Sequence, residues 1–540
     1  MAVTKNQEYT VTVEGYSGEG AGVARIDGFV VFVSGALRGE VCRILILKVL
    51  KSAAFAKVLE VLAPSPHRIT PDCPYFPRCG GCTYRHMDYA EELALKRRRV
   101  QDNLARIGGS GVEVEEILGA AETRRYRNKA QYPVSPDGRI GFYRARTHEV
   151  IDTRECLLVK PEADAAAEAV RQYMRDFRAA GYDERTGRGL LRHVYVRSNT
   201  RDESLICLLV NGKRLPHEAE LVERLRRACP KAVGIVLGEN TRRDNVILGE
   251  RYRTLWGADR LEDALCGRVF RLSVPSFYQV NHEQAERLYA KAIEYAQLTG
   301  EETVLDLYCG AGTITLALAS HAKRVLGAEI VPEAIDDARE NAARSGVENA
   351  EFFCGDASDV AKKLAQENLR PDVITVDPPR KGLAEDVVES IARMQPERVV
   401  YVSCDSATMA RDVKRFAALG YRAVRACAVD LFPRADHVET VVLLSKGEID
   451  SKKVRVEFSL EDMDMSDFQD KATYTQIKDY VLEHSGLKVS NLYISQIKRK
   501  CGLEVGKNYN LPKAEDSRQP QCPSEKENAI REAMKYFGMI

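Results

Sequence analysis

Long apolar runs are missing from this chain. None of its 540 residues lies in an apolar stretch that approaches the roughly 20 residues of a membrane-spanning helix. The N-terminal sequence MAVTKNQEYT also lacks the apolar core of a secretory leader. Neither a membrane span nor export is therefore expected, and the predicted location is the cytoplasm. No obligate protein partner is evident.

Net charge is also nearly absent. The formal charge is +1 at pH 7, so the chain as a whole does not attract nucleic acid, and RNA binding would have to come from local patches. Hydrophobic residues make up 44% and charged residues 29%, which is typical of a soluble globular protein. The length predicts three or four domains. Fourteen cysteines without a secretion signal favour thiol chemistry or metal ligation over disulfides.

A third glycine is missing from the most informative stretch. Residues 303–308 form an apolar run typical of a buried parallel strand, followed by the turn Gly310–Gly312 and an apolar helix over 314–319. A second strand ends on Glu329. This order predicts one βαβ unit of a nucleotide-binding sheet. The two glycines allow a sharp turn and the close approach of a ligand, and Glu329 is placed to accept hydrogen bonds from two ribose hydroxyls.

A dinucleotide fingerprint would read G-x-G-x-x-G, but residues 313–315 are Thr-Ile-Thr. The stretch Asp306–Gly312, DLYCGAG, instead resembles motif I of the class I S-adenosylmethionine (SAM) methyltransferases, whose ligand has no phosphate. The resemblance implies SAM as the cofactor. The alternative is a glycine turn in an α/β domain that binds nothing.

Residues 1–62 are predicted to form a small β-barrel. Apolar residues alternate over 9–13, a glycine-rich turn follows, and further strands are expected at 29–33 and 41–48. The sequence GEGAGVARIDGFVVFVSGALRGE is similar to the TRAM domain, an OB-like RNA-binding barrel. Its candidate phosphate contacts are Arg38, Lys48, Lys51 and Lys57. A solvated barrel with scattered cations is the alternative.

Three closely spaced cysteines form a ligand knuckle: Cys73, Cys79 and Cys82, with Cys156 as the expected fourth ligand. Zinc would accept four thiolates, but zinc ribbons usually pair two C-x2-C knuckles, and only one is present here. A radical-SAM cluster needs three residues in the first gap, where this chain has five. A closed [4Fe–4S] cluster with four cysteines fits best; zinc and free cysteines are the alternatives.

The segment 63–270 is predicted to be a mixed α/β central domain with this cluster. Its helix over 89–107 is expected to pack on the catalytic domain, with the cations of 96–99 on a solvated face. Most of the segment after residue 122 is expected to be strands. One strip of cations and rings is a candidate RNA contact: Arg124, Arg125, Arg127 and Lys129 with Tyr126 and Tyr132.

Residues 271–447 are expected to form a Rossmann-like, seven-stranded class I methyltransferase domain. The remaining residues, 448–540, are predicted to be a small helical extension. It would begin with an acidic linker at 461–470 and continue with helices at 475–484 and 490–501. The run Lys498-Arg499-Lys500 suggests a helix-turn-helix-like RNA contact, and a structural helical cap is the alternative.

Three reactive side chains stand at the ends of predicted strands. Asp377 opens the sequence DPPR, in which amino-methyltransferases have an aromatic residue where this chain has Arg380; attack by an exocyclic amine is therefore disfavoured. Cys404 lies between a strand and a helix, where we expect an exposed thiol that is favoured as the thiolate. Glu439 directly precedes the last strand. Cys309, Cys354 and Cys427 are expected to be packing residues.

A thiol, a carboxylate and a SAM site together predict a reaction. Carbon 5 of a pyrimidine is not nucleophilic enough to take a methyl group unaided. A thiolate that adds to carbon 6 turns carbon 5 into an enolate carbon, which then attacks the sulfonium methyl. A base must afterwards remove the carbon-5 proton so that the cysteine can leave. Cys404 and Glu439 suit these two roles.

The sequences DLYCGAGT, VDPPRKGL, YVSCDSATMARD and FPRADHVE occur in this order and resemble the RNA uracil-C5 methyltransferases. With the barrel and the four cysteines, the chain is most similar to the branch that acts on 23S rRNA. The resemblance implies Cys404 as nucleophile, Glu439 as base and the four cysteines as cluster ligands. It implies SAM contacts from Gln279, Tyr308, Gly310, Gly312, Thr313, Glu329, Asp356 and Asp377.

Two positions depart from the family pattern. Ser406 stands where proline is usual, and Ala435 stands where threonine is common, which removes one hydrogen bond near Glu439. Three rival functions remain: a tRNA uracil-C5 methyltransferase, a cytosine-C5 enzyme, and a non-catalytic RNA-binding protein. The barrel and the cluster disfavour the first, and the Ser-Cys-Asp context disfavours the second. The intact Cys404, Glu439 and Asp377 disfavour the third.

Overall fold

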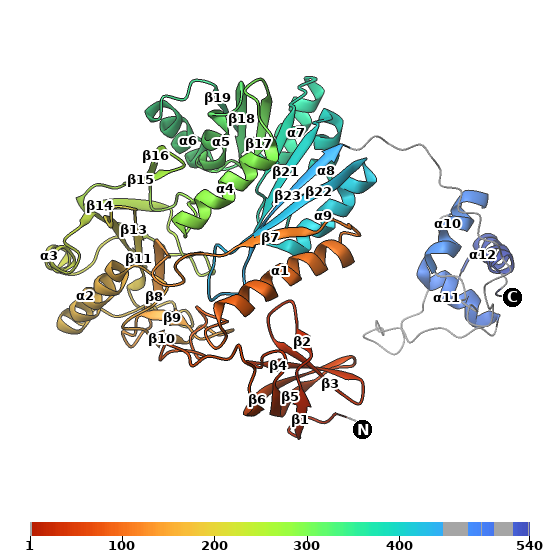
Figure 1. The fold of residues 1–540 in the computed structure, drawn as a ribbon, viewed down its shortest axis with the longest axis horizontal. Coiled ribbons are helices and arrows are strands. Elements are labelled where there is room, and N and C mark those ends of the chain that lie inside the picture. Colours follow the sequence, from red (N-terminus) through yellow and green to blue (C-terminus); the bar gives the residue numbers. More distant parts are fainter. Residues whose placement is uncertain are drawn as a thin grey trace. The chain divides into compact units, whose positions relative to one another are not determined.

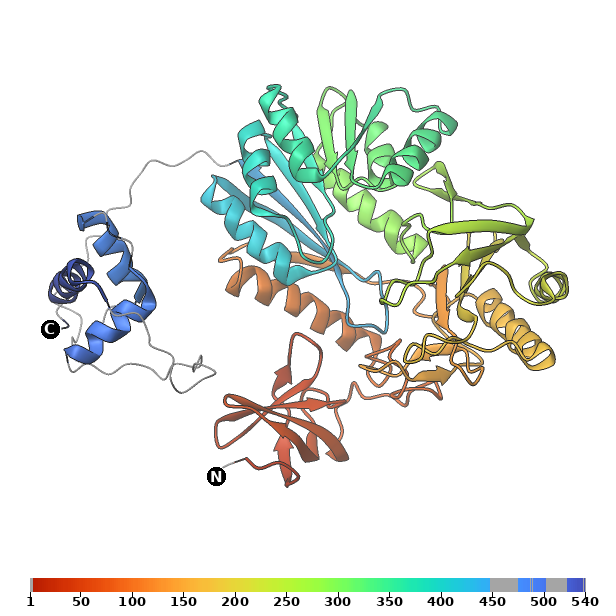
Figure 2. The same ribbon diagram turned by 180° about the vertical axis from the view of Figure 1, so that it is seen from behind.

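The computed structural model describes residues 3–446 and, toward the C-terminus, residues 474–485, 487, 489–501, 522–537 and 539. The chain divides into two compact units, Met1–Asp450 and Ser451–Ile540. Figures 1 and 2 show the elements of each unit from opposite sides. No helix in the described part of the chain is long and apolar enough to cross a membrane.

The N-terminal strands form one six-stranded sheet in the order β1-β5-β6-β4-β3-β2. Apolar and polar residues alternate along these strands, so that one face closes on a core that includes Val31, Cys42 and Ile44. The strands are β1 (Glu8–Thr12), β2 (Gly15–Tyr16), β3 (Gly22–Ile26), β4 (Phe29–Ser34), β5 (Val41–Val49) and β6 (Ala53–Ala63).

The central region has a five-stranded sheet in the order β14-β13-β12-β11-β8. Every residue of β11 (Leu191–Ser198) and β12 (Ser204–Val210) is buried, because apolar clusters lie on both faces of these strands. The other strands are β8 (Lys129–Pro133), β13 (Ala232–Glu239) and β14 (Arg251–Gly257). Helices α2 (Pro161–Phe177) and α3 (Glu218–Ala228) pack on one face. Two hairpins complete the region: β9 (Gly141–Tyr143) with β10 (Val150–Asp152), and β15 (Leu261–Leu265) with β16 (Arg268–Leu272).

The largest sheet has eight strands in the order β19-β18-β17-β20-β21-β23-β22-β7. The prediction of a seven-stranded sheet was wrong by one edge strand. Seven strands come from the expected region: β17 (Thr303–Leu307), β18 (Arg324–Glu329), β19 (Ala350–Cys354), β20 (Val373–Val376), β21 (Arg398–Ser403), β22 (Tyr421–Val429) and β23 (Glu439–Lys446). The eighth, β7 (Val114–Leu118), pairs in parallel with β22 from far away in the sequence, as Figure 1 shows. Its sequence VEEIL is too short and polar to signal this pairing.

Helices cover both faces of this sheet. One apolar core includes residues of α1 (Tyr89–Arg106), α7 (Ala357–Gln366), α8 (Glu385–Met394) and α9 (Ser406–Ala418). The other includes residues of α4 (His282–Ala296), α5 (Thr313–Ala319) and α6 (Pro332–Arg344). The doubly covered, largely parallel sheet brings its ligand-facing groups to the carboxyl ends of its strands.

The C-terminal unit contains three described helices, α10 (Tyr474–Ser485), α11 (Asn491–Lys500) and α12 (Ser524–Tyr536), around a small apolar core. The sequence predicted the first two and missed the third, although α12 carries buried residues at helical spacing, Ala529, Ile530, Ala533 and Met534. The predicted acidic linker at 461–470 lies outside the described residues.

Candidate active site

The glycine turn after β17 opens a space beside the sheet. Tyr308, Gly310 and Gly312 all have positive φ angles, of 72°, 55° and 83°. A Cβ atom at Gly310 would meet no atom within 4 Å, whereas one at Gly312 would lie 3.2 Å from the Cβ of Ala338. Gly310 therefore borders open space, and Gly312 allows α5 to pack closely on α6.

Glu329 closes this turn from the end of β18. One carboxylate oxygen accepts a hydrogen bond from the Gly310 amide at 3.2 Å, and the other accepts from the amides of Ile330 at 2.9 Å and Val331 at 3.0 Å. These bonds fix the carboxylate and leave acceptor capacity for a ligand, since a carboxylate has about four acceptor positions. A diol such as a ribose suits this group.

The other predicted SAM contacts have different roles in the structure. Thr313 shares a hydrogen bond of 3.0 Å with Tyr289. Asp356 is exposed and caps α7, where its carboxylate accepts from the Ser358 amide at 2.9 Å. Gln279 is buried, and its backbone carbonyl accepts from the Asn128 side chain at 2.9 Å. Thr313, Asp356 and Gln279 therefore each have a different partner, and the described contacts do not join them into one cluster.

Asp306 was not among the predicted site residues. It lies in β17, just before the turn, and holds neighbouring segments together through hydrogen bonds. Its carboxylate accepts hydrogen bonds from the hydroxyls of Thr315 at 2.5 Å and Thr375 at 2.9 Å. Burial raises the pKa of Asp306 to about 6. Its position in an otherwise apolar strand, TVLDL, was the available sequence signal.

Strand register brings Cys404 and Glu439 to the same edge of the sheet. β21 and β23 are antiparallel, with Ser403 opposite Thr440, so the next residue of β21, Cys404, stands across from Glu439. β20 is parallel to β21, with Val376 beside Tyr401. Asp377 therefore emerges one strand away, at the same edge.

The charges around Cys404 differ from the sequence-based expectation. Burial, together with the carboxylates of Glu439 and Asp377, raises the pKa of the thiol to about 11, although Arg380 opposes this. The prediction of a favoured thiolate was wrong for this state. The start of α9 is already capped by Asp405, whose side chain accepts from the amides of Ala407 and Thr408, so the helix end is not directed at the thiol.

The pKa values of the two carboxyl groups are themselves raised. Burial, followed by the charge of Asp306, raises the pKa of Asp377 to about 7. Burial and Asp377 raise the pKa of Glu439 well above its ordinary value, and Arg380 opposes this. Three acids and one thiol in a buried space favour a cation as ligand.

The loop that leads to Glu439 is held by α1. Lys96 is fully buried and donates hydrogen bonds to Glu92 at 2.8 Å, to Asp430 at 2.7 Å and to the Phe432 carbonyl at 3.1 Å. The Arg434 carbonyl accepts hydrogen bonds from the backbone amides of Thr83 at 2.7 Å and Tyr84 at 3.1 Å, the two residues that follow Cys82.

The prediction that the cations of 96–99 form a solvated face was therefore wrong for Lys96, whereas Arg97 and Arg98 are exposed. Lys96 is buried, Arg97 bonds the Val114 carbonyl, and Arg99 bonds the carbonyls of Gly18 and Asp436. Only tertiary packing reveals this role, because the acceptors lie far away in the sequence.

Four thiols converge at a second place. Cys73, Cys79, Cys82 and Cys156 line one small pocket together with Arg85 and Phe142. Burial raises the pKa of Cys79, Cys82 and Cys156 to about 11. No group of three or more His, Cys, Asp or Glu side chains in the described ranges is arranged to hold a single metal ion. The four predicted ligands are thus together, but without the tight geometry of a one-metal site.

Arg85 is a residue of this pocket that the sequence did not indicate. It is buried and donates to the Cys82 sulfur at 3.2 Å and to Asp72 at 2.5 Å. The Gly81 amide donates to the Cys79 sulfur at 3.4 Å. Donors of this kind stabilise sulfur that carries negative charge, as in a metal-bound thiolate.

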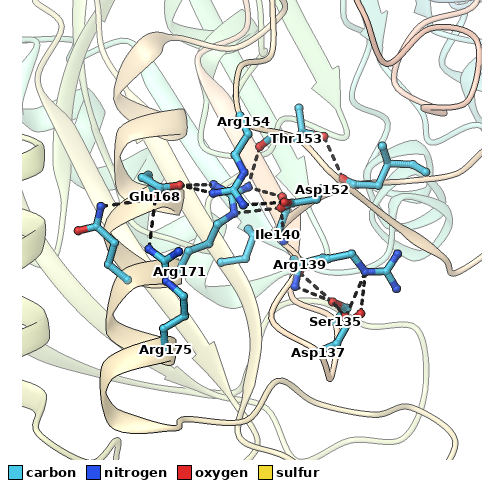
Figure 3. A network of polar contacts seen from close by, with 12 residues as sticks. Ser135, Asp137, Arg139, Ile140, Asp152, Thr153, Arg154, Glu168, Arg171 and Arg175 are labelled. Carbon is cyan, nitrogen blue, oxygen red and sulfur yellow. Dashed lines mark hydrogen bonds and ion pairs between the residues drawn. The ribbon is translucent and has the colours of Figure 1, made fainter.

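Arg171 of α2 holds the hairpin that carries the chain to Cys156 (Figure 3). Its guanidinium donates to the carbonyls of Ile140 at 2.5 Å and Thr153 at 2.7 Å and to the carboxylate of Asp152 at 3.0 Å. Glu168 of the same helix bonds both Arg171 and Arg154. The hairpin end is therefore fixed from two sides.

The predicted strip of RNA-contacting cations and rings was largely wrong. Tyr126 and Tyr132 are buried. Arg124 pairs with Asp72 at 2.5 Å, and Arg125 pairs with Asp164 at 3.1 Å and with Glu155 at 2.6 Å. Only Arg127 and Lys129 remain without such partners among the described residues.

In the C-terminal unit, two of the three cations in the run Lys498-Arg499-Lys500 are also buried or paired. Lys498 is buried, and Lys500 forms an ion pair of 2.6 Å with Glu527 of α12. These contacts favour the structural cap over the RNA contact.

Comparisons with known proteins agree with this geometry. The family described as tRNA (Uracil-5-)-methyltransferase matches residues 88–447, and the TRAM domain matches residues 2–59. A protein of Clostridium tetani described as an uncharacterized RNA methyltransferase is 41% identical over 449 residues, covering 82% of this chain and 98% of that protein. A similar protein of Halalkalibacterium halodurans is 44% identical over 447 residues, with the same coverage.

Among solved structures, the tRNA (uracil-54, C5)-methyltransferase of Pyrococcus abyssi in complex with S-adenosyl-L-homocysteine has a TM-score of 0.66 to this chain. It is 27% identical, and the match covers 81% of this chain and all of the archaeal enzyme.

Proposed function

The chain belongs to the tRNA (uracil-5-)-methyltransferase family, and from this premise we propose that it methylates carbon 5 of a specific uridine in 23S rRNA. The observation that carries the proposal is the strand register that sets Cys404 across from Glu439. A thiol and a carboxylate facing one base from the same sheet edge suit a mechanism of addition and elimination.

SAM, when bound, supplies the methyl group. The residues that fit it are Glu329 for the ribose and the open turn at Gly310, and the acidic surroundings of Asp377 and Glu439 suit its positive charge. A cation there lowers the pKa of both carboxyl groups, so they ionise more readily in the complex than in the free protein.

The residues of the chain then act in sequence. Cys404 loses its proton to solvent, with Arg380 as the nearby cation that favours the thiolate. Its sulfur bonds to carbon 6 of the uracil as the double bond between carbons 5 and 6 opens toward the carbon-4 carbonyl. Carbon 5 becomes nucleophilic and takes the methyl group. Glu439 removes the carbon-5 proton, the bond between sulfur and carbon 6 breaks, and the thiolate returns. Asp306 and Asp405 hold the strand ends in position.

The four-cysteine pocket supports a [4Fe–4S] cluster as the group bound in the central region. The four thiols line one pocket, but only one C-x2-C knuckle is present where zinc ribbons usually pair two, so zinc is the weaker candidate. Cys73, Cys79, Cys82 and Cys156 would hold the cluster, with Arg85 and the Gly81 amide donating to sulfur. When bound, the group would stabilise the knuckle.

tRNA remains the second candidate substrate, because the solved structure that matches 81% of this chain is an enzyme that acts on tRNA. The test is to incubate the purified protein and SAM with 23S rRNA and with tRNA from a strain that lacks the gene, and to map 5-methyluridine. Product on 23S rRNA alone supports the proposal, and product on tRNA alone overturns the choice of substrate. Absence of 5-methyluridine from both overturns the function.

A further inference from the structure

Two positive side chains face each other across neighbouring strands of the central sheet. Lys129, the first residue of β8, pairs directly with Arg197 of β11 in antiparallel register, and Arg127 lies two residues before Lys129. Like charges directly opposite each other in a sheet are destabilising. A pair of this kind is expected only where another interaction offsets its effect, and such sites are usually functional.

Carboxylates that could offset these charges are missing from the described surroundings. Arg197 is 2% exposed; it donates to the Ser276 carbonyl at 2.5 Å and to the Tyr195 hydroxyl at 2.8 Å, and its third nitrogen, Nη1, is buried without a partner. Burial, Arg197 and Arg127 all lower the pKa of Lys129, to about 7. Arg127 and Lys129 are partly exposed and form no ion pair within the described ranges.

The neighbouring cations of the same segment show the contrast. Arg124 and Arg125 each pair with a carboxylate. The missing counterion is therefore specific to Arg127, Lys129 and Arg197.

This group of cations lies beside the loop that carries Gln279, one of the predicted SAM contacts. The Asn128 side chain donates to the Gln279 carbonyl at 2.9 Å, and the Asn128 amide donates to the Val280 carbonyl at 2.8 Å. The Lys129 ammonium lies 6.0 Å from the ring centre of Phe277, and that ring is 64% exposed. The cations thus stand at the base of the loop that carries Gln279, and they are open to solvent through Lys129 and Arg127.

We propose that Lys129 and Arg127 bind a phosphodiester group of the RNA substrate, with the buried Arg197 adding its positive field. The inference rests on the proposed function, since it names a contact of the same site. An RNA phosphate is the anion that such a substrate necessarily brings. The SAM carboxylate is the other oxyanion near this loop, and the experiment separates the two.

The test measures equilibrium RNA binding by three variants of the full chain. Lys129→Met keeps the shape of the side chain without its charge and should weaken binding of an rRNA fragment about tenfold, with a salt dependence smaller by about one phosphate contact. Lys129→Arg keeps the charge and should retain affinity. The control is Lys231→Met in the same domain, whose lysine lies 3.8 Å from Asp202; it should bind as wild type does.

The pH dependence gives a second readout. With a pKa of about 7, Lys129 is partly neutral above that pH in the free protein, and a bound phosphate favours its protonated form. Wild-type affinity should therefore fall between pH 6.5 and 8.5, with proton uptake on binding. Lys129→Arg should remove this slope, because arginine stays charged. This substitution leaves the other charged groups, Arg127, Arg197 and Asp202, unchanged. A change in slope therefore comes from Lys129.

The outcomes separate this inference from the proposed function. Wild-type affinity and an unchanged pH slope in Lys129→Met would overturn the phosphate site while 5-methyluridine formation stands. Weaker SAM binding with unchanged RNA binding would assign the anion to SAM and also overturn it. RNA binding that depends on Lys129 without any methylation would overturn the function alone. A wild-type protein that binds no RNA would overturn both.

Discussion

Thiols occur in two contrasting surroundings in this molecule. Cys404 is a single thiol at a strand end, with three carboxylates and one arginine around it. In the central region, four thiols from loops share one pocket, with an arginine and a backbone amide donating to sulfur. Burial raises the pKa of Cys404 and also that of Cys79, Cys82 and Cys156, so the pKa alone does not distinguish a nucleophile from a ligand.

What distinguishes them is the number and kind of neighbours. A lone thiol beside a carboxyl group can form one covalent bond and have a proton removed close by, which suits catalysis by addition. Four convergent thiols cannot all react with one substrate, but together they can bind an inorganic group. The comparison predicts that each set can be removed without loss of the other set's chemistry.

Loss of the nucleophile should have the largest effect. Cys404→Ala should lower methyl transfer by roughly 10⁴-fold or more, because carbon 5 is never activated, while SAM and RNA still bind. Cys266→Ser, which changes a partly buried thiol outside the site, should remain active. Denaturing gels with RNA that contains 5-fluorouridine provide the measurement. A trapped complex formed by Cys404→Ala would mean that another thiol reacts.

Loss of the base should be nearly as severe but should look different. Glu439→Gln should still permit thiolate addition and methyl transfer, whereas removal of the carbon-5 proton should slow by roughly 10²- to 10⁴-fold. A methylated covalent complex with RNA should accumulate and survive on a denaturing gel. Normal turnover by this variant would place the base elsewhere, with Asp377 as the next candidate.

Substitutions in the four-cysteine pocket should remove the bound inorganic group and leave the nucleophile in place. Cys79→Ser and Cys156→Ser should lose bound iron and sulfide from anaerobically purified protein and lower its thermal stability. Cys404→Ala should keep the full iron content and the brown colour of the wild type. One zinc per chain in colourless wild-type protein would contradict the cluster.

A smaller effect is expected from the acids near Cys404. Because the folded-state pKa of Asp377 is raised to about 7, its contribution to stability is present at low pH and is lost as the pH rises toward and through 7. Glu439 contributes with the same sign. Asp377→Asn should therefore flatten the fall in unfolding free energy between pH 4 and 7.5, measured by urea unfolding. A steeper fall in this variant would contradict the assignment.

The smallest effect is expected from the C-terminal unit. Because Lys498 is buried and Lys500 pairs with Glu527, truncation after residue 447 should leave SAM affinity, RNA affinity and the salt dependence of RNA binding unchanged. A flatter salt dependence in filter-binding measurements would restore the RNA-contact role of Arg499.

Local patterns predicted some parts of this molecule well and others poorly. The βαβ unit around Gly310 and Glu329 could be predicted from the sequence, because its strands are short apolar runs and a glycine turn follows the first of them. The edge strand β7 was not, since its pairing with β22 depends on a contact between segments about 300 residues apart. Lys96 of α1 was misassigned for a related reason: a lysine in a positive run is expected to be solvated unless its distant acceptor, here Asp430, is known.

The sequence by itself determined the reactive groups, their order and the family, because these depend on residue types and short spacings. It also supplied the four pocket cysteines, since closely spaced cysteines indicate ligation. Only the tertiary structure decided which charged side chains have partners of opposite charge. Strand register set Cys404 opposite Glu439 with acids that raise the thiol pKa, and it left Lys129 and Arg127 without counterions while Arg124 and Arg125 were paired. Burial and long-range pairing set these energies, and neither is contained in a local pattern.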